Sequence, residues 1–186
     1  MIHFRTLTMK NFLSIGAVSQ SIDLSHAGLT LVLGENLDIE GSGNKNGVGK
    51  SAMLSALCYA LYGQALTNIK KDNLINSINK KNMVVSIEFE RDGALYRIER
   101  GRRPNFFKYM VNNENRTEDN SDEAQGENKD TQAEIERLLG LSHVMFKHIV
   151  SLNTYTEPFL SLGAGKQREI IEELLGITLL SQKSDN

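Results

Sequence analysis

The run Asn44-Lys45-Asn46-Gly47-Val48-Gly49-Lys50-Ser51 constrains the fold of this chain more than any other stretch, because of what flanks it. Before it, Leu29 to Leu33 is short, apolar and rich in branched residues, which predicts a buried strand. After it, Ala52 to Leu61 predicts an apolar helix that ends near Gly63. A strand, a glycine-rich turn and a Gly-Lys-Ser that opens a helix are the context of a phosphate-binding loop.

The residue types in this loop suit a polyphosphate ligand. Backbone amides at the start of a helix lack partners, and the helix dipole favours an anion there. Gly47 and Gly49 let the backbone curve closely around phosphate oxygens. Lys50 supplies a flexible positive charge for the outer phosphates, and the hydroxyl of Ser51 can ligate Mg²⁺.

Two features depart from the usual pattern G-x-x-x-x-G-K-[ST]. Asn44 stands at the first glycine position, where asparagine is the next best residue for a left-handed backbone. Residues 37 to 43 look like a short insertion within the loop. The alternative is a glycine-rich surface loop with an incidental Gly-Lys-Ser, which the flanking strand and helix disfavour.

Composition limits the class of protein. The 186 residues suffice for one domain with a core, and the net charge of −2 means that any contact with DNA must be a local patch. Cys58 is the only cysteine and lies in the apolar helix, so we expect a small buried hydrophobe. The sequence has no apolar run of membrane-spanning length and no signal peptide, which predicts a protein of a reducing cytoplasm without a membrane partner.

Alternation of apolar and polar residues predicts strands in the first 111 residues. Residues 2 to 10 form an opening strand with one irregularity, and residues 21 to 24 form a second strand. Residues 83 to 111 read as an antiparallel meander with a hairpin turn at Asp92-Gly93. We expect helix 51 to 62 to pack against the strand at residues 29 to 33.

The remaining residues predict a polar loop and then helices. Residues 112 to 130 contain little to bury and predict a mobile acidic loop. Thr131 and Glu134 form a capping box for a helix that Gly140 ends. Ser142 is expected to cap another helix, and residues 166 to 175 to form an amphipathic one. The inward-facing residues of the helix after Ser142 are expected to be Val144, Met145, Ile149 and Val150.

Six segments of the chain occur in a characteristic order. They are the opening Leu7-Thr8-Met9-Lys10-Asn11-Phe12, the phosphate loop, Leu74-Ile75-Asn76, the run from Arg100 to Asn105, Phe146-Lys147, and the run from Arg168 to Ile177. In this order they resemble the N-terminal part of the SMC-like ABC ATPases of double-strand-break repair, and within them SbcC and the large subunit of phage recombination endonucleases. The phosphate loop alone is common to many NTPases, and the ordered set is more specific.

The resemblance implies an α/β P-loop NTPase of the ABC or SMC type with a mixed central sheet. Residues 1 to 176 would be the N-terminal lobe of its ATPase head, and residues 177 to 186 the start of a coiled coil or a truncation tail. The C-terminal lobe would carry the remaining catalytic motifs, so this chain alone would be inactive. The implied partners are that lobe, a second copy of the head, an SbcD-like nuclease subunit and double-stranded DNA. A phage-encoded member would act in the host cytoplasm.

The resemblance also implies roles for residues. Lys50 would bind the β- and γ-phosphates of ATP, and Ser51 would hold Mg²⁺. Asn153 stands where the family has the Q-loop glutamine that reaches Mg²⁺ and the attacking water, and it is one methylene shorter; a plain loop residue is the alternative. The other expected nucleotide contacts are Lys10, Asn11, Asn46, Gly47, Val48, Gly49 and Ala52.

Seven of the basic residues between Lys70 and Lys108 could bind successive phosphates of a DNA backbone or could simply form a solvated face. Phe107 and Tyr109 are expected in the core of the sheet. Two other functions stay open: a nucleotide-regulated DNA-binding module without turnover, and an SMC-type chromosome organiser. The basic residues of this set are Lys70, Lys71, Lys80, Lys81, Arg102, Arg103 and Lys108.

Overall fold

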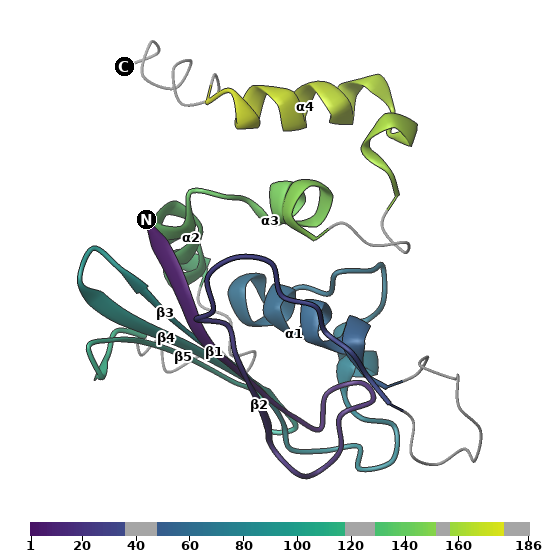
Figure 1. The fold of residues 1–186 in the computed structure, drawn as a ribbon, viewed down its shortest axis with the longest axis vertical. Helices are drawn as coiled ribbons and strands as arrows, with labels where there is room; N and C mark the ends of the chain where they lie inside the picture. The colour runs from purple at the N-terminus through teal and green to yellow at the C-terminus, as the bar shows by residue number, and fades with distance from the viewer. Residues whose placement is uncertain (36–47, 118–128, 152–156, 177–186) are drawn as a thin grey trace. The chain divides into compact units, whose positions relative to one another are not determined.

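A computed structural model describes residues 1–35, 48–117, 129–151 and 157–176. The chain divides into two compact units, Met1–Leu138 and Leu139–Asn186. The first unit contains the sheet and the apolar helix that follows Gly49 (Figure 1). The second unit contains short helical segments, and each unit is treated by itself.

The first unit is built on one antiparallel sheet whose strand order is β2-β1-β3-β4-β5-β6. All pairings within the described residues are antiparallel, so the parallel part of the mixed sheet that we expected is not found among them. The opening strand, the second strand and the meander are confirmed. Their bounds are β1 Ile2–Lys10, β2 Gln20–Asp23, β3 Met83–Arg91, β4 Ala94–Arg102, β5 Phe106–Val111 and β6 Glu114–Asn115.

The core of this unit lies on one face of the sheet. Successive side chains of a strand point to opposite faces, so the paired residues Leu7, Ile87, Ile98 and Tyr109 form one inward row across β1, β3, β4 and β5. None of the four is more than 1% exposed. The irregularity expected in the opening strand is a register shift between Phe4 and Thr6.

The apolar helix after the loop is α1, Lys50–Tyr62, and it ends at Gly63 in the left-handed region, with φ 63°. It packs against β3, β4 and β1 on the inward face (Figure 1). Cys58 is buried within it, as expected.

The predicted buried strand at residues 29 to 33 is wrong, and so is the packing of α1 against it. No strand forms there, and Leu29, Leu31 and Leu33 are 103%, 78% and 72% exposed. A strand of this composition requires neighbouring strands on both sides to satisfy its backbone and cover its side chains. The described residues of this chain supply neither.

Two helical segments complete the first unit. The short 3-10 helix η1 spans Lys71–Leu74, and α2 spans Lys129–Leu139 with Ile135 fully buried. The capping box is a wrong prediction because α2 already includes the two residues before Thr131, and Thr131 is buried inside the helix. Gly140 follows the helix with φ 63°, as expected for its end.

The second unit contains α3 His143–Met145, the π-helical turn η2 Phe146–Val150, the 3-10 turn η3 Phe159–Ser161 and α4 Ala164–Leu174. Met145, Leu162 and Ile170 form its small core. The inward positions expected at Val144, Ile149 and Val150 are wrong, since these residues are 39%, 39% and 55% exposed. The π-helical turn changes the angular spacing of side chains, so a pattern read at 3.6 residues per turn loses its register there.

Ser142 caps α3 as predicted, because its Oγ accepts a hydrogen bond from the Met145 amide at 3.2 Å. The same hydroxyl donates to Glu173 Oε2 at 2.8 Å, and the Ser142 amide donates to Glu173 Oε1 at 3.1 Å. The carboxylate of α4 therefore completes the N-terminal cap of α3, which fixes these two helices to each other. Among the described residues, no helix is both long enough and apolar enough to cross a membrane.

Candidate phosphate-binding site

The start of α1 has the geometry of an anion site. Gly49 is the N-cap residue with φ 90°, and its carbonyl accepts hydrogen bonds from the amides of Ala52 and Met53 at 3.0 and 3.3 Å. No side chain caps the helix, and its first turn carries no acidic residue. The hydroxyl-bearing Ser51 is exposed. Among the described residues, no side-chain hydrogen bond caps this end of the helix, where the helix dipole favours an anion.

Gly34 brings the end of the apolar run against the start of the helix. A Cβ built on Gly34 would lie 2.1 Å from Val48 Cγ2 and 3.7 Å from the ammonium nitrogen of Lys50. Any larger residue at this position would displace one of these groups, so the close approach requires glycine. Gly34, where the exposed run ends, therefore lies against Val48 and Lys50 at the start of the helix.

The C-terminal end of α1 is held by the backbone amide of Gly63 and by two side chains from outside the helix. The amide of Gly63 donates to Tyr59 O at 2.8 Å, Arg100 Nε donates to Ala60 O at 2.9 Å, and Gln132 Nε2 donates to Leu61 O at 3.3 Å. These carbonyls are among the last four of the helix, which lack partners within it. A positive charge at this end also complements the helix dipole.

Arg100 makes the main contacts that hold the C-terminal end of α1, and no functional or structural role was predicted for it from the sequence. It is 3% exposed, it bonds Gln132, and its guanidinium lies 4.0 Å from the centre of the Phe107 ring. The signal in the sequence was its place two residues after Ile98, which puts it on the inward face of β4. Arg100 joins the sheet to the C-terminal end of α1 and so fixes the helix that follows Gly49.

Lys10 and Asn11 end β1 and begin a tight turn. Asn11 is 3% exposed with φ 50°, and its Nδ2 donates to the carbonyls of Lys81 and Asn82 at 2.9 and 3.1 Å. Its Oδ1 accepts from Asn79 Nδ2 at 2.8 Å. The side-chain amide of Asn11 is therefore committed to the protein, and Asn11 acts here by shaping the turn.

The same turn reaches the phosphate loop. A Cβ on Gly49 would lie 3.4 Å from Ile15 Cδ1 and 3.5 Å from Ser14 Oγ. On its other side, the carbonyl of Asn11 accepts from the Asn76 amide at 2.8 Å, and Phe12 forms a bridge with Ile75. The turn thus connects the start of α1 with the segment that leads into β3.

Of the predicted nucleotide contacts, the structure brings Val48, Gly49, Lys50, Ser51 and Ala52 together at the start of α1. Asn46, Gly47 and Asn153 lie outside the described residues, as do Asn44 and the insertion at residues 37 to 43. In the part of the chain that the structure describes, no group of three His, Cys, Asp or Glu residues could hold a metal ion. The assignment of Ser51 to Mg²⁺ stays a prediction.

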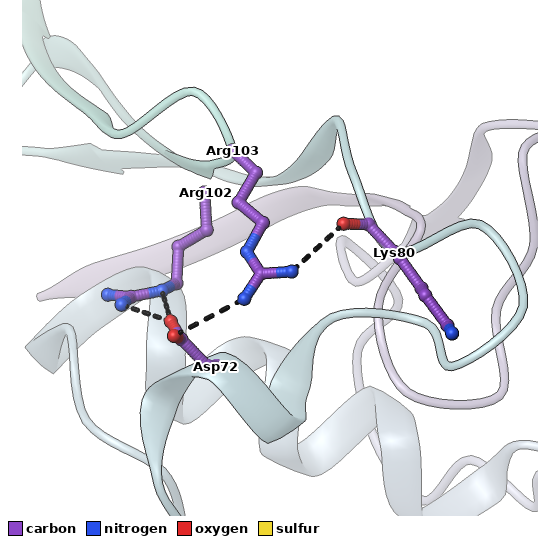
Figure 2. A network of polar contacts seen from close by, with 4 residues as sticks. All are labelled: Asp72, Lys80, Arg102 and Arg103. Atoms are coloured by element: carbon purple, nitrogen blue, oxygen red, sulfur yellow. Dashed lines mark hydrogen bonds and ion pairs between the residues drawn. The ribbon is translucent and has the colours of Figure 1, made fainter.

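A second polar cluster lies at the end of the sheet where β4 turns into β5 (Figure 2). Asp72 of η1 accepts hydrogen bonds from Arg102, with Nε at 3.0 Å, and pairs with Arg103 at 3.5 Å. Arg103 Nη1 also donates to the carbonyl of Lys80 at 3.4 Å. The hydrogen bond from Arg102 lowers the pKa of the Asp72 carboxyl, so the cluster keeps its ion pairs at neutral pH.

Comparison with known proteins adds three findings. A protein-family profile described as "AAA domain" matches residues 6–184. The chain is 38% identical over 175 residues to "Exonuclease subunit 2" of Enterobacteria phage T4, and 36% identical over 175 residues to the protein of that name in Escherichia phage RB69. Both alignments cover 93% of this chain and 28% of the relative, so the chain spans little more than a quarter of their length.

One solved structure has a similar fold over the whole chain. It is an Smc head domain with an extended coiled coil, bound to the C-terminal domain of ScpA, from Pyrococcus furiosus. The TM-score is 0.64 at 20% sequence identity, with 100% of this chain and 44% of the other chain covered. At this identity the likeness shows the fold alone, which is that of an SMC-type head.

Proposed function

Because the chain belongs to the AAA-domain family, we propose that it is the ATP-binding N-terminal lobe of an ATPase that controls a nuclease acting on DNA ends. The observation that carries the proposal is the start of α1, where Gly49, Lys50 and Ser51 form a helix N-terminus without a side-chain cap hydrogen bond among the described residues. The 38% identity to a phage exonuclease subunit supports the role beside a nuclease.

Each residue of the loop would have a separate role in binding the nucleotide. Backbone amides at Val48 and Gly49, with Asn46 and Gly47 before them, would hold phosphate oxygens, and Lys50 would neutralise the charge of the outer phosphates. Ala52, whose amide donates to Gly49 O at 3.0 Å, would border the phosphates. Ser51 would orient Mg²⁺, which supplies the Lewis acid that phosphoryl transfer uses. Asn153 would take the place of the Q-loop glutamine, and Lys10 would lie at the edge of the nucleotide.

The exposed run from Leu29 to Leu33 supports a role as one lobe of a larger head. Its apolar side chains are open to solvent, and the chain spans 28% of the length of its relatives. We propose that strands of a C-terminal lobe pair with this run and complete the mixed sheet. Residues 1 to 176 would then be the N-terminal lobe, and residues 177 to 186 would lead into a coiled coil.

In the assembled protein, two heads would bind two ATP molecules between them, as the SMC-type fold permits. Hydrolysis would then change the access of an SbcD-like nuclease subunit to double-stranded DNA ends. The proposed place of action is the cytoplasm, which for a phage protein is that of the host.

The test measures ATP hydrolysis and ATP-dependent exonuclease activity of the complete protein with its nuclease subunit. We expect Lys50→Ala to abolish both activities and Ser51→Ala to shift the Mg²⁺ dependence to higher concentrations. Turnover that is unchanged in Lys50→Ala would refute the assignment of the loop. ATP binding without any turnover in the wild type would instead favour a nucleotide-regulated binding module.

A further inference from the structure

We propose that Asn76 is a positioning residue of the nucleotide site, which acts by holding the turn at residues 11–16 against Gly49 at the start of α1. The inference rests on the proposed function, because it names a residue outside the phosphate loop on which the binding of ATP would depend. Asn76 lies between η1 and β3, 27 positions after Gly49 in the sequence. The pattern of a phosphate loop contains no signal for such a residue.

The side chain of Asn76 is buried and uses both of its polar atoms. It is 6% exposed, and its Nδ2 donates to the carbonyl of Leu13 at 2.9 Å. Its Oδ1 accepts from the amides of Ile78 and Asn79 at 3.1 and 3.0 Å. The donor end of the amide therefore holds the turn, whereas the acceptor end holds the segment that leads into β3.

The backbone around Asn76 binds the same turn. The amide of Asn76 donates to Asn11 O at 2.8 Å, and the amide of Leu13 donates to Leu74 O at 2.7 Å. Together with the bond from the Asn76 side chain, these contacts fix Leu13 at both its amide and its carbonyl.

The turn has to be held because Leu13 has an unfavourable backbone conformation. Its φ is 48°, in the left-handed region that residues with a Cβ seldom adopt. Asn11 has a similar φ of 50°, but asparagine tolerates this region better than leucine does. Such a conformation persists only where its surroundings impose it, and the bond from Asn76 to the Leu13 carbonyl is one of the contacts that impose it.

The residues after Leu13 lie against the residue that begins α1. A Cβ built on Gly49 would lie 3.5 Å from Ser14 Oγ and 3.4 Å from Ile15 Cδ1. Ile15 is buried, so its side chain has little room to move independently of its backbone. A shift of Leu13 would therefore move the two side chains that border Gly49.

Gly49 is the point at which this turn can affect a nucleotide. It is the N-cap residue of α1 with φ 90°, and its carbonyl accepts from the amides of Ala52 and Met53 at 3.0 and 3.3 Å. Its position therefore sets the direction of the first helical turn, which begins with Lys50. Because a polyphosphate is held by backbone amides and a lysine in fixed positions, displacement of Gly49 would weaken its binding.

The alternative is that Asn76 only stabilises the fold. The two roles can be separated because the two ends of the side-chain amide hold different segments. Asn76→Asp keeps an acceptor for the amides of Ile78 and Asn79 but removes the donor to Leu13 O. A purely structural residue would change the stability of the protein without changing the KM for ATP.

The experiment uses the complete protein and compares Asn76→Asp with Asn112→Ala. Asn112 lies in the turn that follows β5, at the other end of the sheet; it also has a left-handed φ of 50°, and its Oδ1 accepts from the Leu95 amide at 2.9 Å. Steady-state ATP hydrolysis gives kcat and KM. Hydrogen exchange followed by mass spectrometry reports the mobility of residues 11–16 and 48–53, and thermal unfolding reports stability.

We expect Asn76→Asp to raise the KM for ATP by roughly tenfold, with kcat changed by less than about threefold, because one buried hydrogen bond that positions the site is lost. Hydrogen exchange should become faster in both segments. Asn112→Ala should lower the unfolding temperature and leave the KM and the exchange of both segments as in the wild type. If Asn76→Asp does not fold, the same results are expected of Asn76→Ser, whose hydroxyl can still accept from the nearby amides.

A wild-type KM in the Asn76 variant, with or without a loss of stability, would overturn the proposal and leave Asn76 a structural residue. An equal rise of KM in Asn112→Ala would overturn it as well, because any destabilised variant would then show the effect. Absence of ATP binding and hydrolysis in the wild type would instead be a failure of the proposed function, so the two failures are distinguishable.

Discussion

Replacement of Arg100 by methionine should destabilise the protein far more than the same replacement of Arg97, three residues earlier on the same strand. Arg100 is 3% exposed and donates to Ala60 O at 2.9 Å, and its guanidinium lies 4.0 Å from the centre of the Phe107 ring. A hydrogen bond from a charged donor contributes about 1.5–3 kcal/mol. A desolvated cation–π contact and the charge at a helix C-terminus each add about 1 kcal/mol.

These contributions overlap because they come from one guanidinium, and methionine keeps the apolar stem. We therefore expect Arg100→Met to lower the free energy of unfolding by about 3 kcal/mol. Arg97 makes ion pairs with Glu88 and Glu99 at 3.7 and 3.2 Å, and its side chain is 43% exposed. Exposed ion pairs of this kind contribute at most about 1 kcal/mol, so Arg97→Met is the matched control.

The assay is urea unfolding of wild type and both variants, followed by far-UV circular dichroism. A larger fall of the midpoint for Arg100→Met, at an unchanged slope, would support the role of Arg100 at the end of α1. Equal midpoints for the two variants would refute the reasoning, because it would mean that burial and the bond to Ala60 add nothing.

Two further predictions concern the phosphate loop and the ion pairs of Asp72. Gly34→Ala places a methyl group 2.1 Å from Val48 Cγ2, so we expect the affinity for ATP to fall by roughly tenfold. The control is Gly16→Ala, where a Cβ meets nothing within 4 Å. Affinities are measured by calorimetric titration, and equal values for the two variants would contradict the expectation. Asp72 has a pKa lowered by the hydrogen bond from Arg102. Its contribution to stability is therefore present above the pKa of the unfolded chain, about 3.9, and is lost as the pH falls through the lower value of the folded state. Thermal melting points measured from neutral to acid pH should fall less steeply in Asp72→Asn than in the wild type, and parallel curves would argue against the ion pairs.

Local patterns predicted the first unit well where each element satisfies its backbone within itself, as α1 does, or with strands of the described residues, as β1 and the meander do. β1, the meander from β3 to β5 and the helix α1 follow directly from alternation, an Asp-Gly turn and a terminal glycine. The phosphate loop stays a prediction, which residue types at fixed spacing suggested, and the structure describes its last residues at the start of α1.

The failures arise where the outcome depends on distant partners. The run from Leu29 to Leu33 has the composition of a central strand, yet no strand of the described residues pairs with it. The π-helical turn at Phe146–Val150 broke the helical register on which the inward positions were assigned. The role of Arg100 depends on a contact with Ala60, 40 positions away, that no local pattern contains.

Calorimetric titration of ATP in the presence of Mg²⁺ into the complete protein, its Lys50→Met variant and its Lys166→Met variant tests the central claim most directly. If the start of α1 holds the polyphosphate, Lys50→Met should lose at least tenfold in affinity, whereas replacement of the exposed Lys166 on α4 should change nothing. Equal affinities in all three proteins would contradict the account.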